Sequence, residues 1–267
     1  MEFLFLIGNS KIKTREGERM IALASDFDGT IYFGEKQGFY QSDLDAIIAF
    51  QNAGNLFGIC TGRPLVGIEP VMKGKIDLDF YILSSGAVVL DKHQNILYKK
   101  CLPREVFNEI YKTYHQDVEI GIQANQKMYA FHQLKMPMEQ IIISSPDDIK
   151  GDDIFCLSID GKNEENAAKI CQDITTRFGD VVDSYQNIEY IDIVAKGCSK
   201  GEAIKKYKAI QGIDVIGGIG DSYNDLPMLD NVDQAFSFFR SPAIVQESAD
   251  HLVYSVCDAL MIFMNER

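Results

Sequence analysis

Two carboxylates that follow directly on an apolar run near the start of the chain limit most strongly what it can fold into. Residues 20–24 have the length and character of a strand buried on both faces, and Asp26 and Asp28 come after it, followed by Gly29 and Thr30. Side chains at the carboxyl end of a parallel strand lie in the crevice where ligands bind. Two acids crowded there repel each other unless a cation or a proton lies between them. Asp and Gly also form solvated turns, but the buried run before these acids favours a functional site.

The elements that follow this segment alternate between helix and strand. Short apolar runs predict strands at 56–60, 80–83 and 215–219, and a helix is expected from an N-cap at Ser42 to residue 53. Strands that alternate with helices form parallel sheets. The sequence therefore predicts an α/β fold with a Rossmann-like parallel sheet.

The pattern between residues 86 and 187 is different. Alternating polar and apolar residues predict hairpin strands there, and helices are expected from Pro103 and over 164–178. An insert of about a hundred residues is a normal size for a domain. The expected division is a core domain of residues 20–85 and 188–267, interrupted by an inserted α+β domain of residues 86–187.

The first nineteen residues are set apart from this pattern. Their apolar stretch, residues 2–8, is too short to span a bilayer and lacks the basic start and cleavage site of a secretory signal. Residues 15–19 are what a purine-rich ribosome-binding site would encode if it were translated. We expect residues 1–19 to be a leader outside the natural protein, with Met20 as its start; a peripheral N-terminal strand is the alternative.

The charge and the cysteines bound the partners of this protein. A net charge of −13 over 267 residues argues against a surface for nucleic acid or anionic membranes. The six cysteines form no Cys-x-x-Cys pair, which is typical of reduced thiols in a cytoplasmic protein. We expect a cytoplasmic protein with no nucleic-acid or membrane partner, and its oligomeric state stays open.

Reactive side chains follow the predicted strands or begin the next helix. They are Asp26, Asp28, Thr61, Lys200, Asp221, Asn224 and Asp225. In a parallel sheet these groups converge on one crevice, where an all-oxygen set of carboxylates favours Mg²⁺. The Thr61 hydroxyl, the Lys200 ammonium and nearby backbone N–H groups would hold an anion beside that cation. Together these parts describe phosphoryl transfer, in which the protein supplies position and charge neutralisation.

At this point the chain resembles the haloacid dehalogenase superfamily. The matching motifs are Asp26-Phe27-Asp28-Gly29-Thr30, Thr61-Gly62-Arg63-Pro64, Lys200 and Gly220-Asp221-Ser222-Tyr223-Asn224-Asp225. Their order and the long insert between the second and third motifs are similar to those of the Cof-type, or IIB, phosphatases. The resemblance implies that the insert is a cap that shapes the leaving-group pocket.

The resemblance also implies a role for each matching residue. Asp26 would be the nucleophile that forms an aspartyl-phosphate, and Asp28 would protonate the leaving alcohol and then activate water. Mg²⁺ would be held by Asp26, the backbone carbonyl of Asp28 and Asp221, with Asp225 in support. Phosphoryl oxygens would be bound by Thr61, Gly62, Lys200 and Asn224, and Arg63 would reach the substrate.

Two segments depart from the family pattern. The family often has Asn before Gly-Ala after the third strand, where this chain has Ser85-Gly86-Ala87, and the run 236–241 replaces an Ala-Met-Gly-Asn-Ala-like segment. The expected substrates are small phosphorylated metabolites, with sugar phosphates first and nucleotides or cofactor phosphates second. A phosphotransferase or phosphomutase of the same superfamily is the nearer alternative. A metal-dependent sugar-nucleotide glycosyltransferase is the alternative from another class, in which Lys200 and residues 220–225 have no role.

Overall fold

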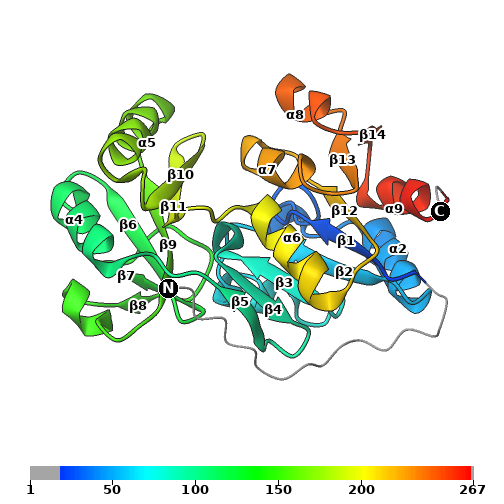
Figure 1. The fold of residues 1–267 in the computed structure, drawn as a ribbon, viewed down its shortest axis with the longest axis horizontal. Coiled ribbons are helices and arrows are strands. Elements are labelled where there is room, and N and C mark those ends of the chain that lie inside the picture. The colour runs from blue at the N-terminus through cyan, green and yellow to red at the C-terminus, as the bar shows by residue number, and fades with distance from the viewer. Residues whose placement is uncertain (1–18, 266–267) are drawn as a thin grey trace.

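The chain forms two separate sheets, as a computed structural model that describes residues 19–265 shows (Figure 1). The first sheet has eight strands in the order β14-β13-β12-β1-β2-β3-β4-β5. The second has six strands in the order β10-β11-β9-β6-β7-β8. We call the part built on the first sheet the core and the part built on the second sheet the cap.

The strands have the following bounds. They are β1 (Ile21–Ser25), β2 (Leu56–Cys60), β3 (Phe80–Leu83), β4 (Val88–Asp91), β5 (Ile96–Lys99), β6 (Glu119–Ala124), β7 (Lys127–Ala130), β8 (Ile141–Ile142), β9 (Ile154–Asp160), β10 (Val182–Asn187), β11 (Tyr190–Ala195), β12 (Val215–Ile219), β13 (Gln234–Phe238) and β14 (His251–Val253).

Helices cover both sheets. They are α1 (Gly34–Gln37), α2 (Gln41–Asn52), α3 (Glu69–Met72), α4 (Arg104–Tyr114), α5 (Glu164–Phe178), α6 (Lys200–Gln211), α7 (Leu226–Leu229), α8 (Ala243–Glu247) and α9 (Val256–Asn265). Single 3₁₀ turns lie at Leu65–Gly67, Ser84–Gly86, Pro146–Ile149 and Tyr223–Asp225.

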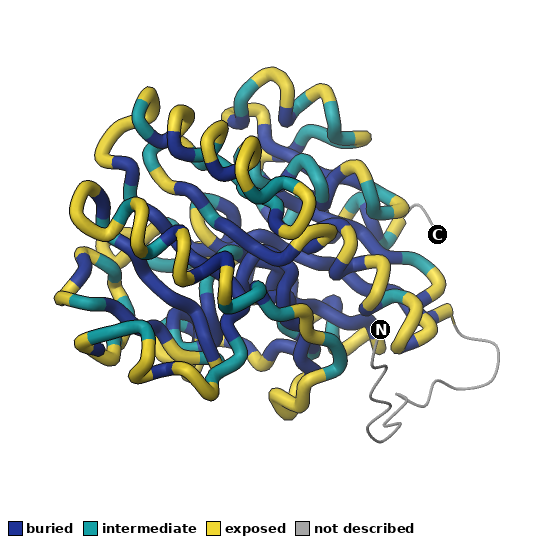
Figure 2. Tube along the Cα trace, turned by 60° about the vertical axis from the view of Figure 1, so that its left-hand side comes forward, coloured by how far each residue is buried: buried dark blue, intermediate teal, exposed yellow. Residues whose placement is uncertain are grey.

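Strand β1 is the centre of the core because it is buried on both faces. Ile21 and Leu23 pack into one apolar cluster with side chains of α2 and α9, whereas Ala22 and Ala24 pack into another with α6 and α7. Each large apolar side chain removed from water in this way contributes about 1.5–3 kcal/mol. In Figure 2 buried segments run through the interior, and the exposed residues lie around them. The strong burial of β1 fixes where its carboxyl end lies.

Strand direction brings the ends of three core strands together. Strand β1 pairs in parallel with β12 on one side and with β2 on the other. The residues that follow these three strands therefore lie along one edge of the sheet. This edge faces the cap.

The cap is a sheet with two helices on its outer face, and its strands pair antiparallel except for β8, which runs parallel to β7. Strand β9 pairs with β6 and β11, and α4 and α5 pack on this sheet through apolar side chains such as Phe107 and Ile170. Helix α5 begins where the Asn163 side chain accepts a hydrogen bond from the N–H of Asn166, so the N-cap is satisfied. The inner face of the sheet is left free to face the core.

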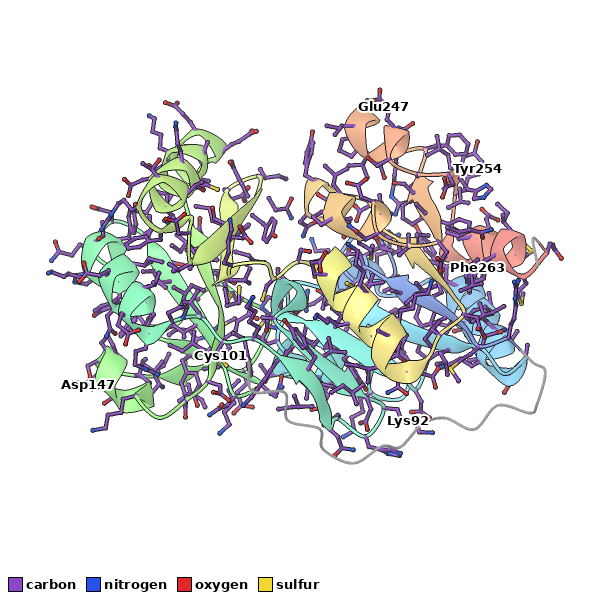
Figure 3. All side chains as sticks on the ribbon, in the orientation of Figure 1. Lys92, Cys101, Asp147, Glu247, Tyr254 and Phe263 are labelled. Atoms are coloured by element: carbon purple, nitrogen blue, oxygen red, sulfur yellow. The ribbon has the colours of Figure 1, made fainter. Side chains whose placement is uncertain are left out.

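Two chain segments join core and cap. One lies between β5 and α4 and contains Cys101, which is labelled in Figure 3. The other lies between β11 and α6, and Lys100 Nζ in the first segment donates a hydrogen bond to the carbonyl of Lys196 in the second at 2.6 Å. The two connections therefore run side by side.

The predicted fold class, a Rossmann-like α/β core with an inserted α+β unit, is confirmed, but some details differ. Hairpin β4–β5 was expected in the insert, yet β4 pairs with β3 in the core sheet, while β11 extends the cap sheet to Ala195. The predicted boundaries after residues 85 and 187 therefore fall short of where the two sheets divide. Strand alternation shows that a segment is half-buried, but it does not show which sheet the segment joins.

The expected helix start at Ser42 was also wrong. Helix α2 begins at Gln41 after Tyr40, without a side-chain cap, so Ser42 lies inside it. The expected leader lies almost wholly outside the described residues. No helix in the described part is long and apolar enough to cross a bilayer.

Candidate active site

Three carboxylates from two strand ends form the centre of the site. Asp26 follows β1, and Asp221 and Asp225 follow β12, which is the parallel neighbour of β1. Ligand atoms of these three residues lie within 4.8 Å of one another. Such a cluster of oxygen ligands has the chemistry of a site for a hard divalent cation. The structure thus brings together the acids that the motifs single out.

Lys200 is buried against this cluster at the start of α6. Its Nζ donates hydrogen bonds of 2.6 Å to Asp26 Oδ1 and 2.6 Å to Asp225 Oδ1, and the residue is only 2% exposed. Burial alone would lower the pKa of Lys200, but the Asp225 and Asp26 carboxylates raise it well above its usual value. The ammonium therefore stays charged.

One lysine does not balance three acids. Burial raises the pKa of Asp26 well above its usual value, and the neighbouring Asp225 adds to the rise, although Lys200 opposes it. Burial and Asp225 also raise the pKa of Asp221. These carboxyls gain from a further positive charge, since a cation stabilises their ionised form.

Gly29 and Thr30 hold the motif of residues 26–30 against the motif of residues 220–225. Gly29 has φ +81°, and a Cβ there would come within 2.7 Å of Asp221 Oδ2, so this turn needs glycine for both its conformation and its space. The Thr30 hydroxyl donates to Asp221 Oδ1 at 3.0 Å. The second oxygen of Asp221 is left for a ligand.

Asp28 points away from the buried cluster toward Arg63. The Arg63 guanidinium donates to both oxygens of Asp28, at 2.7 and 2.6 Å. Arg63 is held in turn by the carbonyl of Gly67 at 2.9 Å, and its guanidinium lies 5.1 Å from the centre of the Phe27 ring. The Asp28 side chain is 52% exposed. Two acids of one motif thus have opposite surroundings.

A cavity of about 300 Å³ lies between these groups and the cap. Asp26, Asp28, Thr61, Gly62 and Asn224 line it from the core. The Thr61 hydroxyl lies at the end of β2 and accepts the N–H of Arg63 at 3.2 Å, leaving its own proton for a ligand. Of the expected site residues, Lys200, Asp221 and Asp225 lie behind this wall.

The cap supplies residues that sequence reasoning missed. Gln123, Ser158 and Asp192 line the same cavity, and the Gln123 amide donates to the carbonyl of Gly62 at 2.9 Å. Ser85 donates from the core to Asp192 at 2.6 Å. The one sequence signal was the unusual Ser85 before Gly86, because the side chain at this position reaches the cap.

Residues 236–241, the second segment that departs from the family pattern, pack against the motif of residues 26–30. The Arg240 guanidinium donates to the carbonyl of Gly29 and lies 3.6 Å from the centre of the Phe238 ring. Phe236 and Phe238 are fully buried. This segment packs mainly against the core and steadies the turn after Asp28.

A parallel α/β core with an acidic cluster at its strand ends and a cap over the cavity defines a class of phosphoryl-transfer proteins. A family comparison agrees, because residues 23–259 match the haloacid dehalogenase-like hydrolases. The chain therefore belongs to this family and is a hydrolase. The predicted family, its Cof-type architecture and the enzyme class are confirmed.

Similar proteins support the same assignment. A "Putative phosphatase" of Haemophilus influenzae is 27% identical over 225 residues, which are 78% of this chain and 81% of that protein. Among solved structures, a phosphatase of the same superfamily from Bacteroides thetaiotaomicron has a TM-score of 0.76 at 19% identity, over 96% of this chain and 99% of that one. A subclass IIB sugar phosphatase has a TM-score of 0.77 at 19% identity, over 91% and 98%. At these identities the structures show a shared fold.

Proposed function

We propose that this hydrolase is a Mg²⁺-dependent phosphatase that releases phosphate from small phosphorylated metabolites, sugar phosphates first, through an aspartyl-phosphate. One observation carries the proposal: a carboxylate is buried at the end of a cavity, beside a charged lysine and two more acids. That arrangement suits a nucleophile that must approach an anionic phosphoryl group.

The donor set fits a magnesium ion. Lys200 occupies Oδ1 of Asp26 and Thr30 occupies Oδ1 of Asp221, so each carboxylate keeps its second oxygen for a cation. Asp225 uses one oxygen for Lys200 and the other for the N–H groups of residues 221 and 222, so it supports the site from behind. Asp26, Asp221 and the backbone carbonyl of Asp28 would hold the ion. When bound, it would neutralise charge on the phosphoryl oxygens and help to orient them.

The two acids of the first motif divide the chemistry. An oxygen of Asp26 attacks phosphorus, and the bond to the ester oxygen breaks as that oxygen takes a proton from Asp28. Asp28 then takes a proton from water, which attacks the aspartyl-phosphate and releases Asp26 and phosphate. Thr61 and the backbone at Gly62 bind phosphoryl oxygens, with Asn224 beside them on the cavity wall. The Lys200 ammonium, bonded to Asp26 behind this wall, supplies positive charge to the phosphoryl oxygens as they reach Asp26.

Arg63 acts in this scheme on Asp28, not on the substrate. Its two hydrogen bonds fix both oxygens of a carboxylate that is otherwise half exposed. A bidentate pair of this kind restricts position as well as adding energy. Arg63 is thus a positioning residue for the proton donor.

The cavity limits the substrates to small molecules. Its volume of about 300 Å³ is at the lower end for ligand pockets, and the cap lies over it. A sugar phosphate fits this size, and one similar structure is a sugar phosphatase.

All six cysteines are free thiols in the structure, in line with a cytoplasmic protein.

A phosphate-release assay tests the proposal. The protein should release phosphate from p-nitrophenyl phosphate with Mg²⁺ and lose this activity when a chelator removes the ion, with recovery when Mg²⁺ is restored. An added alcohol distinguishes the alternatives, because a phosphotransferase or phosphomutase would pass the group to that alcohol or to a second sugar phosphate. Equal rates with and without the chelator, or transfer in place of release, would refute the proposed function.

A further inference from the structure

Polar groups on the inner face of the cap have no part in the phosphoryl-transfer steps. Gln123 on β6, Ser158 on β9 and Asp192 on β11 come from three neighbouring strands, and all three line the cavity. Gln123 is only 2% exposed. Because buried polar groups are costly unless they have partners, a polar cluster in this position needs an explanation.

The hydrogen bonds in this cluster leave it with acceptors but no free donor. Gln123 Nε2 donates to the carbonyl of Gly62 at 2.9 Å and to Ser158 Oγ at 3.0 Å. Ser158 Oγ donates to Asp192 Oδ1 at 2.9 Å, and Ser85 Oγ donates to Asp192 Oδ2 at 2.6 Å. The amide of Gln123 and the two serine hydroxyls thus all donate within this hydrogen-bond network.

The polar atoms of this network that remain available are therefore acceptors. A carbonyl oxygen only accepts, so the bond to Gly62 fixes the orientation of the Gln123 amide. Its Oε1 has no hydrogen-bond partner among residues 19–265. Asp192 has lone pairs beyond the two that the serine hydroxyls occupy. Burial raises the pKa of Asp192, but both hydroxyls and the Lys200 ammonium favour its ionised form.

Among the residues that the structure describes, no buried unpaired cation lines the cavity beside these acceptors. Of the two positively charged residues that line it, Arg63 is paired with Asp28 and Lys135 is an exposed residue of the cap. An anionic group placed beside Asp192 would be repelled by its carboxylate, and the Lys200 ammonium that acts on Asp192 is already bonded to Asp26 and Asp225. A hydroxyl group placed there could donate a hydrogen bond to Asp192 or to Gln123 Oε1.

Asp192 also lies close to the phosphate-binding loop. A Cβ added to Gly62 would come within 2.7 Å of Asp192 Oδ2, so the carboxylate touches the residue that follows Thr61. A substrate group beside Asp192 is therefore attached near the ester bond. Any phosphate ester bound at Thr61 places its first carbons in this region.

We propose that Asp192 and Gln123 form a subsite that accepts hydrogen bonds from hydroxyl groups next to the ester carbon and rejects a carboxylate or second phosphate there. The inference rests on the proposed function and narrows the substrates to monophosphates of polyols and sugars. A site built to bind a hydroxyl discriminates strongly against an analogue that lacks it, since its buried polar groups are then left unpaired. Repulsion adds discrimination against anions.

Four phosphate esters test the subsite in the intact protein. Glycerol 3-phosphate carries a hydroxyl on the carbon next to the ester carbon, and n-propyl phosphate carries none. In 2-phosphoglycolate the carbon next to the ester carbon is a carboxylate, and p-nitrophenyl phosphate reports on the catalytic core. We expect kcat/KM for glycerol 3-phosphate to exceed that for n-propyl phosphate by about 10-fold or more, the effect of a hydrogen bond to a charged group. The rate with 2-phosphoglycolate should be the lowest.

Asp192→Asn should remove most of this preference. We expect the glycerol-to-propyl ratio to fall several-fold and the rate with 2-phosphoglycolate to rise, while p-nitrophenyl phosphate changes little. A gain on 2-phosphoglycolate cannot come from a damaged fold. Gln123→Met, which keeps the length of the side chain but removes its amide, should also lower the ratio. Asp160→Asn, the same substitution on β9 outside the cavity lining, is the matched control and should leave all four rates unchanged.

Three results would overturn the inference. An unchanged ratio in both Asp192→Asn and Gln123→Met, with p-nitrophenyl phosphate still hydrolysed, would show that the subsite does not select substrates. An equal loss on all four esters would mean that Asp192 only holds the cap against Ser85. If the unmodified protein hydrolyses none of the four esters, the proposed function fails, and the subsite fails with it.

Discussion

The core wall and the cap wall of the cavity are built in opposite ways. On the core side, each functional group stands at a strand end or a helix start, and the wall combines acids with a buried lysine. On the cap side, Gln123, Ser158 and Asp192 stand within strands and offer acceptors to the cavity. The core therefore suits the phosphoryl group that all substrates share, and the cap suits the part in which they differ.

This difference predicts which substitutions act on every substrate and which act on some. Changes in the core should lower all rates together, because they affect the bond that breaks. Changes in the cap should alter the order of the substrates. A core variant that reorders substrates, or a cap variant that abolishes turnover of every ester, would contradict the division.

The largest effect is expected at Asp26. Asp26→Asn removes the proposed nucleophile and should abolish turnover of all esters while the fold survives. Asp28→Asn should be slower by about 10²–10⁴-fold, the usual contribution of general acid–base catalysis. Steady-state rates with p-nitrophenyl phosphate and glycerol 3-phosphate measure both, with Asp160→Asn as the control. Undiminished activity in purified Asp26→Asn would exclude the covalent mechanism.

A smaller effect is expected at Arg63, because its proposed role is to position Asp28, with which it is paired. Arg63→Ala should lower kcat by about 10- to 100-fold, within the range of the acid that it positions. The loss should be greater for alkyl phosphates than for p-nitrophenyl phosphate, since a nitrophenolate leaves without a proton. Arg63→Lys keeps the charge but loses the bidentate geometry, so its kcat should lie between those of the unmodified protein and Arg63→Ala. A rise in KM with unchanged kcat would instead mean that Arg63 binds substrate.

The core wall could be predicted from the sequence because its geometry is local. Asp26 and Asp28 lie within four residues of the apolar run 20–24, so strand order alone brings them to one edge with residues 221–225. Lys200 was expected there for the same reason. What could not be foreseen is how these groups pair, such as the Lys200 bridge between Asp26 and Asp225 and the turn of Asp28 toward Arg63.

The cap wall could not be predicted for a physical reason. Asp192 lies between Ile191 and Ile193 in β11, and this alternation is typical of a strand with one face in water. Only the packing of that polar face against the core turns Asp192 into a cavity residue. Hairpin β4–β5 was placed in the wrong sheet for the same reason, since alternation identifies a face but not its neighbour.

The proposed metal site predicts a stabilising effect that depends on pH. Mg²⁺ that binds only the folded protein should raise its melting temperature, by about 2–4 °C for each kcal/mol of binding energy at this size. Asp221→Asn should remove most of that rise and, by relieving repulsion within the cluster, should increase the melting temperature of the metal-free protein. Differential scanning calorimetry with and without Mg²⁺ measures both. An equal Mg²⁺-dependent rise in Asp221→Asn would place the ion elsewhere.

The pH dependence follows from the raised pKa values of Asp26 and Asp221. Between the usual pKa of a carboxyl group and the raised one, the folded protein binds more protons than the unfolded chain, so metal-free stability falls as the pH rises through this window. Protons and Mg²⁺ compete for the same carboxylates. The rise in melting temperature caused by Mg²⁺ should therefore grow as the pH increases through the same window, and a constant rise would contradict the assignment.

The smallest effect is expected at Ser85, where the two walls touch. Ser85 has φ +53°, a conformation that costs a non-glycine residue free energy, and its hydroxyl donates to Asp192. Ser85→Ala loses the hydrogen bond and keeps the strain, which should cost about 1 kcal/mol and lower the melting temperature by about 2–4 °C. Ser85→Gly loses the same bond but relieves the strain, so it should be more stable than Ser85→Ala by up to about 1 kcal/mol. Thermal unfolding compares the pair, and exposed Ser248→Ala is the control. If Ser85→Ala is as stable as the unmodified protein, the contact between core and cap contributes nothing to folding, and its hydroxyl serves only to orient Asp192.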